Sequence, residues 1–187
     1  ICRFVFMNLT FILKFLKDLA RHNDREWFEK NKSRYLEAKA GFEKVVEAVL
    51  KEVVKFDPAL AGLDPRKLPF RIYRDVRFSK DKRPYKTNMG AGFSPNGRLI
   101  QEPGYYLHLE PSNKSFIAGG IYMPDASNLA KIRQEIDYNP DGLKKIMTAK
   151  KFKGAFGDFD DFDKLKTTPK GYAQDHPQIE WLRLKSF

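Results

Sequence analysis

The segments FRIYRDVRF (70–78), NMGAGFS (88–94), GYYLHLE (104–110) and SFIAGGIY (115–122) decide the fold class. They are short runs rich in aromatic and β-branched residues, and clusters of Pro, Gly, Asn and Ser separate them at the spacing of hairpins. This pattern predicts an antiparallel β-meander of about four or more strands. The glycines inside these runs indicate bulges or places where a neighbour packs closely on the backbone.

Helical patterns lie on both sides of this meander. Before it, apolar residues recur at helical spacing, and Asp24 is placed to cap a short helix that holds Trp27 and Phe28. After it, two Pro-Asp pairs are typical helix starts, whereas residues 151–176 resemble a loop. The predicted helices are 11–22, the short one after Asp24, 33–55, 125–138, 140–150 and the first turns of one over 177–184. The sequence therefore predicts a single α+β domain over residues 1–187, with the meander packed against N-terminal and C-terminal helices.

The composition is that of a packed, soluble globule. The chain has 187 residues, 42% of them hydrophobic, so one core can bury roughly two thirds of the surface that the unfolded chain exposes. Its only cysteine, Cys2, excludes an intrachain disulfide framework and indicates a reducing compartment. No stretch approaches the roughly 20 apolar residues of a membrane helix. We therefore expect a cytoplasmic protein that does not enter a membrane.

Positive charge is concentrated in one short segment. The 35 Lys and Arg residues exceed the 24 Asp and Glu residues, which leaves a formal charge of +11. Residues 66–86 carry nine basic and two acidic side chains, so this segment alone supplies +7. Such an excess favours anionic partners, and we expect either an anionic small molecule or a nucleic acid.

Basic and aromatic residues interleave in this segment. If residues 70–78 form a strand, Phe70, Ile72, Val76 and Phe78 share one face, and Arg74 lies among them. A guanidinium on an apolar face must be paired or hydrogen-bonded, because an unpaired buried charge is very costly. We therefore expect a partner for Arg74.

Two interpretations of the segment stay open. In the first, its cations converge on a phosphate or carboxylate, with Tyr73 or Tyr85 as a stacking face. In the second, they form a structural ion-pair network with Asp75, Asp81 and carboxylates elsewhere, such as the acidic stretch 158–163. That stretch lacks the glycine of a calcium loop, so we expect no EF-hand. The candidate ligand-binding residues are Arg71, Tyr73, Arg74, Arg77, Lys80, Lys82, Arg83 and Lys86.

Only His108 is a candidate for acid–base chemistry. Strand alternation puts it beside Tyr106 and Glu110, and a histidine near a carboxylate can transfer protons near neutral pH. A histidine on the polar face of a sheet explains the same pattern without catalysis. The other histidines, His22 and His176, are scattered, so we expect no metal and no cofactor. Nucleophile elbows and phosphate-binding glycine loops are missing from the sequence, and whether the protein is an enzyme stays open.

Several blocks of the sequence together resemble a widespread bacterial family, the domain of unknown function numbered 2461, from about residue 11 onward. The blocks are FLKDL (15–19), NDREWF (23–28), FRIYRD (70–75), RFSKDK (77–82), PYKT (84–87), GYYLH (104–108), YMP (122–124) and DHP (175–177). The resemblance implies no particular activity, substrate or cofactor. It implies that members continue beyond residues 182–187, so we expect this chain to lack a C-terminal helical segment. The basic block and His108 are carried over as positions that match family motifs.

Three functions therefore fit the sequence. The first is a pocket at residues 70–86 that holds a phosphate-bearing or other anionic molecule, either as a ligand that is only bound or as a substrate that is processed. The second is a nucleic-acid-binding module, which requires an extended and exposed basic stripe. The third is a structural or interaction domain whose arginines are neutralised internally.

Overall fold

The computed structural model describes residues 2–98 and 102–187. The chain forms two compact units, each considered by itself below. Unit 1 comprises the described parts of residues 1–99 and 104–119, and unit 2 comprises those of residues 100–103 and 120–187. The organisation as one domain stays a prediction.

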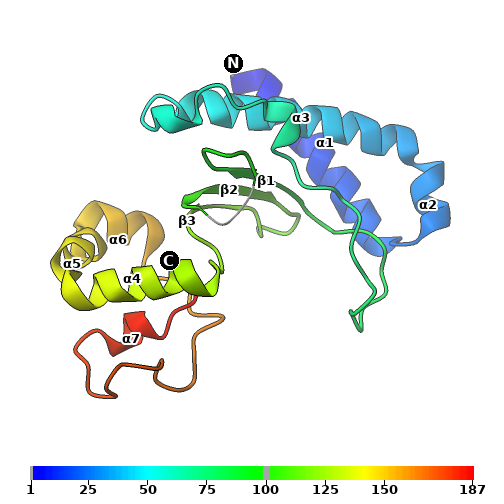
Figure 1. The fold of residues 1–187 in the computed structure, drawn as a ribbon. Helices are drawn as coiled ribbons and strands as arrows, with labels where there is room; N and C mark the ends of the chain where they lie inside the picture. Colours follow the sequence, from blue (N-terminus) through cyan, green and yellow to red (C-terminus); the bar gives the residue numbers. More distant parts are fainter. Residues whose placement is uncertain (1, 99–101) are drawn as a thin grey trace. The chain divides into compact units, whose positions relative to one another are not determined.

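Unit 1 begins with three helices, α1 (Cys2–Arg21), α2 (Arg25–Lys30) and α3 (Lys32–Val53). Apolar spacing predicts these helices, although it places the start of α1 at residue 11 rather than at Cys2. Asp24 caps α2 as expected, because its carboxylate accepts the Trp27 N–H at 2.8 Å. Two single 3-10 turns, η1 (Pro58–Leu60) and η2 (Pro65–Lys67), lead from α3 toward the sheet. The long helices α1 and α3 pack against each other (Figure 1).

The described residues form a three-stranded antiparallel sheet with the order β1 (Met89–Phe93), β2 (Gly104–Leu109) and β3 (Phe116–Gly120). The α+β class is confirmed, but the prediction of four or more strands is wrong. Residues 70–78 form no strand, and residues 69–85 contribute only isolated bridges, Pro69 with Ala91 and Tyr73 with Tyr85. Pro69 and Pro84 have no N–H to donate, so a regular ladder is interrupted at both.

The two faces of the sheet differ in character. Met89, Ala91 and Phe93 alternate inward with Leu107 and Leu109, and these side chains are buried against the helices. The opposite face of β1 carries only Gly90 and Gly92, which lie beside His108 and Tyr106 of β2 in the register. We call this second surface the glycine face.

Unit 2 is mainly helical, with α4 (Ala126–Tyr138), α5 (Pro140–Thr148), α6 (Lys150–Phe156) and the short α7 (Ile179–Leu182). The interpretation of residues 151–176 as loop is wrong at its start, where α6 lies. Extended backbone at Ala149 separates α6 from α5. The signal for α6 is the pair Phe152 and Phe156, one helical turn apart, whose ring centres are 5.1 Å apart.

The last residues of the chain are held within unit 2. Backbone hydrogen bonds of 2.7 and 3.0 Å pair Ile121 with Phe187, and Arg133 donates to the carbonyl oxygens of Leu182 and Leu184. Burial lowers the pKa of Arg133.

Within residues 2–98 and 102–187, no helix is both long and apolar enough to cross a membrane.

Candidate functional site

Residues 70–86, called the basic loop below, fold back on themselves. The Lys86 N–H donates to the Ile72 carbonyl at 2.8 Å, and the Arg74 N–H donates to the Pro84 carbonyl at 2.9 Å. Side chains alternate between outward and inward positions from residue 70 to 77, as in the predicted strand. Phe78 breaks the alternation, because its ring is 95% exposed. The inward and outward faces are therefore predictable, although the strand is not.

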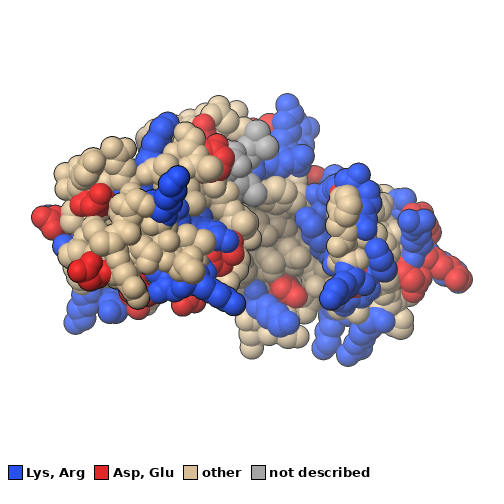
Figure 2. All heavy atoms as spheres, turned by 60° about the horizontal axis from the view of Figure 1, so that its bottom comes forward, with Lys and Arg blue, Asp and Glu red and all other residues tan. Residues whose placement is uncertain are grey.

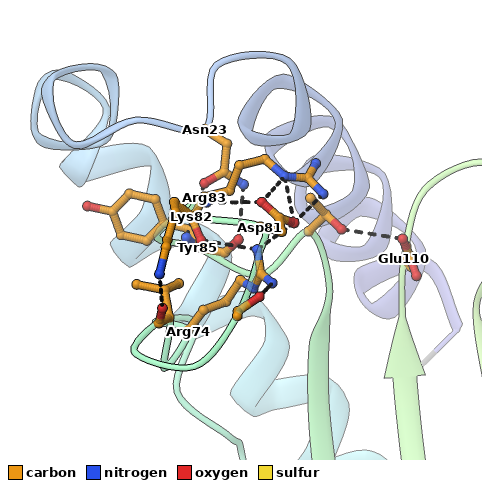
Figure 3. A network of polar contacts seen from close by, with 10 residues as sticks. Asn23, Arg74, Asp81, Lys82, Arg83, Tyr85 and Glu110 are labelled. Atoms are coloured by element: carbon orange, nitrogen blue, oxygen red, sulfur yellow. Dashed lines mark hydrogen bonds and ion pairs between the residues drawn. The ribbon is translucent and has the colours of Figure 1, made fainter.

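Tyr85 attaches the basic loop to the junction between α1 and α2. Its ring stacks on Phe28 with centres 3.9 Å apart, and both side chains are buried. Asn23 exchanges two hydrogen bonds with the Tyr85 backbone, at 3.0 and 3.1 Å (Figure 3). Packing and hydrogen bonding together fix the base of the loop.

Asp81 neutralises two arginines across the loop (Figure 3). Its carboxylate lies 2.7 Å from Arg74 Nη1 and 2.7 Å from Arg83 Nη2. The hydrogen bonds of Arg83, and then those of Arg74, hold the pKa of Asp81 far below its ordinary value. The Arg74 side chain is only 24% exposed, as expected for an inward guanidinium, and Asp81 is the partner that such a group requires.

A second ion pair lies on the outer side of the loop. Arg77 forks onto Asp75 with contacts of 2.7 and 3.0 Å. In the acidic stretch 158–163, Asp163 instead forms an ion pair with Lys185, and both residues belong to unit 2. The internal network of the structural interpretation thus exists, but its carboxylates come from the loop itself.

Lys86 differs from these arginines. Its side chain is half-buried, and its Nζ atom lies 5.7 Å from the centre of the Phe70 ring. The guanidinium of Arg98 lies 5.9 Å from the same ring and donates to the Pro69 carbonyl. No carboxylate pairs with Lys86 in the part of the chain that the structure describes. Burial, and then the nearby charge of Arg71, lower the pKa of Lys86.

A shallow depression of about 200 Å³ lies beside Lys86 and the Asp81 ion pairs. This volume is below the range for drug-sized ligands but sufficient for a single anionic group. A wider hollow of about 610 Å³ lies between α1 and the turn after β2, but its lysines, Lys14 and Lys17, are exposed on a helix surface and need no partner. The smaller depression is lined by Arg74, Asp81, Arg83, Tyr85, Lys86, Thr87 and Asn88.

His108 lies in a hydrogen-bonded chain on the glycine face. Its Nε2 lies 3.0 Å from the Glu110 carboxylate, and its Nδ1 lies 3.1 Å from the Tyr106 hydroxyl and 3.4 Å from the Asn88 amide. Because a carboxylate only accepts, Nε2 donates to Glu110, and Nδ1 of the neutral ring accepts. Both ring nitrogens are therefore occupied. A positioning role on the sheet explains His108 better than direct contact with a substrate.

The hydrogen-bonded chain around His108 also connects the sheet with the depression. Glu110 accepts a hydrogen bond from the Thr87 hydroxyl at 3.4 Å, and both Thr87 and Asn88 line the depression. The ring of Phe116 stacks on His108 with centres 4.6 Å apart and covers the chain from the β3 side. The arrangement fixes the end of the basic loop, because Thr87 and Asn88 are held by Glu110 and His108 of the sheet.

The structure places the sequence-predicted cations in four groups. Arg74, Arg77 and Arg83 are neutralised by loop carboxylates, Lys82 donates to the Val76 carbonyl, and Arg71 and Lys80 point outward. Lys86 alone combines burial with a missing counter-charge.

Sequence reasoning missed Asn23 and Arg98 as parts of this region. No local signal identifies them, because each is brought there by contacts distant in sequence. Within the described ranges, no cluster of three or more His, Cys, Asp and Glu side chains could hold a metal ion. The remaining histidine of unit 2, His176, contacts Asp137 at 3.0 Å.

Comparison with known protein families identifies the family of this chain. A family model described as a conserved hypothetical protein, DUF2461, matches residues 11–187. No curated protein and no solved structure matches the chain. The match covers nearly the whole chain, including the basic loop and the sheet, and the chain therefore belongs to the DUF2461 family.

Proposed function

We propose that unit 1 binds a small anionic ligand, of the phosphate or carboxylate class, in the depression beside Lys86. The observation that carries this proposal is the half-buried amine of Lys86, which has no carboxylate partner among the described side chains. A cation that loses water without gaining a counter-charge is destabilised, and an anionic ligand supplies that charge.

The other lining groups suit the same ligand. Arg74 and Arg83 are held in place by Asp81, so they are positioned before the ligand arrives. Three cations and one carboxylate leave a net charge of +2 around the depression, which favours a doubly charged group such as a phosphate monoester.

A purely structural loop explains the arginines but not Lys86. Structural ion pairs neutralise the charges that they bury, as Asp81 does for Arg74. Lys86 lines the depression instead, next to the hydroxyl of Thr87 and the amide of Asn88. The Thr87 hydroxyl donates its hydrogen to Glu110, whereas the Asn88 amide carries two N–H donors, one for Nδ1 of His108 and one for a ligand oxygen.

Calorimetric titration with inorganic phosphate and pyrophosphate, at low ionic strength and neutral pH, tests this function. Lys86→Met should weaken binding about tenfold or more, since a hydrogen bond to a charged group contributes about 1.5–3 kcal/mol. The matched control is Lys80→Met, which removes the same charge from an exposed position of the same loop. Equal losses in the two variants, or no binding by the wild-type protein, would overturn the proposal.

A further inference from the structure

The tip of the basic loop exposes an aromatic ring. The hydrogen bond from Arg74 to Pro84 closes the tip, and Phe78 lies within it, 95% exposed. The guanidinium of Arg77 lies 5.8 Å from the centre of the Phe78 ring. The tip extends away from the sheet (Figure 1). The Phe78 ring therefore has open surface for a planar partner.

The same loop also carries exposed cations. Arg71, Lys80 and Lys82 are exposed and make no ion pair with a described carboxylate. In Figure 2, Lys and Arg atoms gather around the basic loop, on the right of the view. Tyr73 adds a second aromatic ring, 43% exposed, at the bridge near the base of the loop.

We propose that this exposed side of the basic loop binds single-stranded nucleic acid. Phe78 stacks on a base, and Arg71, Lys80 and Lys82 neutralise phosphates. Base–aromatic stacking tolerates any sequence, because every base presents a flat π-face, and adjacent cations follow the backbone. This surface is separate from the Lys86 depression, since none of these four residues lines it.

A strand of nucleic acid fits this surface better than a membrane does. Phe78 lies at the tip and Tyr73 at the bridge with Tyr85, so the two exposed rings occupy different levels of the loop. A flat bilayer that meets the tip does not reach the base, whereas a flexible strand can run along the loop and contact both rings. One inserted ring also buries little apolar area in a bilayer.

Fluorescence anisotropy of labelled oligo-dT and oligo-rU, titrated with the full chain at several salt concentrations, tests the proposal. Each neutralised phosphate contributes about 0.7 to the slope of log affinity against log salt for a single strand, so three cations predict a slope near 2. Lys80→Gln should reduce the slope by about 0.7. Lys86→Met should leave oligonucleotide binding unchanged, which separates this surface from the proposed ligand site.

The aromatic contribution has its own matched pair of variants. Phe78→Ala should weaken binding roughly fivefold to 150-fold at an unchanged salt slope, because stacking contributes about 1–3 kcal/mol per base. Phe56→Ala removes a ring that is 68% exposed at the end of α3 and should have no effect. Equal effects of the two changes, or no oligonucleotide binding, would overturn the proposal. So would binding to vesicles of anionic phosphatidylglycerol without binding to oligonucleotides, which would identify a membrane surface instead.

Discussion

Tyr106 occupies the space that a side chain at Gly90 would need. A Cβ atom built on Gly90 would lie 2.9 Å from Cζ of Tyr106 and even closer to its hydroxyl oxygen. The glycine thereby lets the Tyr106 hydroxyl reach Nδ1 of His108 at 3.1 Å. Close packing of a glycine strand against an aromatic residue thus builds the polar chain of the glycine face.

Gly90→Ala should therefore destabilise unit 1 by about 1–3 kcal/mol, the usual cost of overpacking. Urea unfolding measures the loss. Gly119→Ala is the control, since a Cβ there would lie 3.6 Å from the Tyr105 ring, an ordinary contact. An equal loss in both variants would mean that glycine replacement in the sheet, rather than the Tyr106 contact, is responsible.

Apart from α6, the helices could be predicted from the sequence because their signals are local. Asp24 and Asp125 both cap the helices that follow them, through hydrogen bonds within three residues. The basic loop shows the limit of such reasoning. Its alternation is local and was predictable, but a strand also needs a partner ladder, and Pro84 lies where that ladder would continue.

The candidate site was predictable only in part, for the same reason. In the sequence, Lys86 is one of many cations in the basic loop. Only the three-dimensional contacts show that it is half-buried and has no described carboxylate partner. Whether an arginine is neutralised depends on which carboxylate the loop brings near, as Asp81 shows for Arg74. By sequence alone the acidic stretch 158–163 is an equally suitable partner, but its Asp163 contacts Lys185.

Asp81→Asn should lower the stability of unit 1 at neutral pH, because Arg74 and Arg83 lose their shared partner. Hydrogen bonds from Arg83 and Arg74 depress the pKa of Asp81 in the folded protein. The pair therefore stabilises above the unfolded pKa of about 3.9, and this stability is lost as pH falls through the lower folded pKa. The difference between wild type and variant should shrink as pH falls below 4.

Urea midpoints measured from pH 7 down to pH 3 check this dependence. Glu37→Gln, which removes an exposed carboxylate of α3, is the control and should give a small difference at every pH. A difference for Asp81→Asn that stays constant with pH would show that the carboxylate charge is not what holds the loop.

Asn23→Ala should loosen the base of the basic loop. The substitution leaves the N–H and carbonyl of Tyr85 without their side-chain partner, at an expected cost of about 1–3 kcal/mol. Hydrogen exchange of the Tyr85 amide should become faster, while that of amides in the middle of α3 changes only through the global loss of stability. Unchanged exchange at Tyr85 would show that the stack on Phe28 alone fixes the loop.

The proton equilibrium of Lys86 tests the central claim most directly. Burial and the charge of Arg71 lower the pKa of Lys86 below the ordinary value of 10.5, so a bound anion should raise it again. By linkage, phosphate binding should take up protons at alkaline pH and weaken as pH rises through this pKa. The measurement is NMR titration of the Lys86 side chain, from pH 7 to pH 11, with and without inorganic phosphate. The account predicts a higher Lys86 pKa with phosphate and no change for Lys80, whereas an unchanged Lys86 pKa would contradict it.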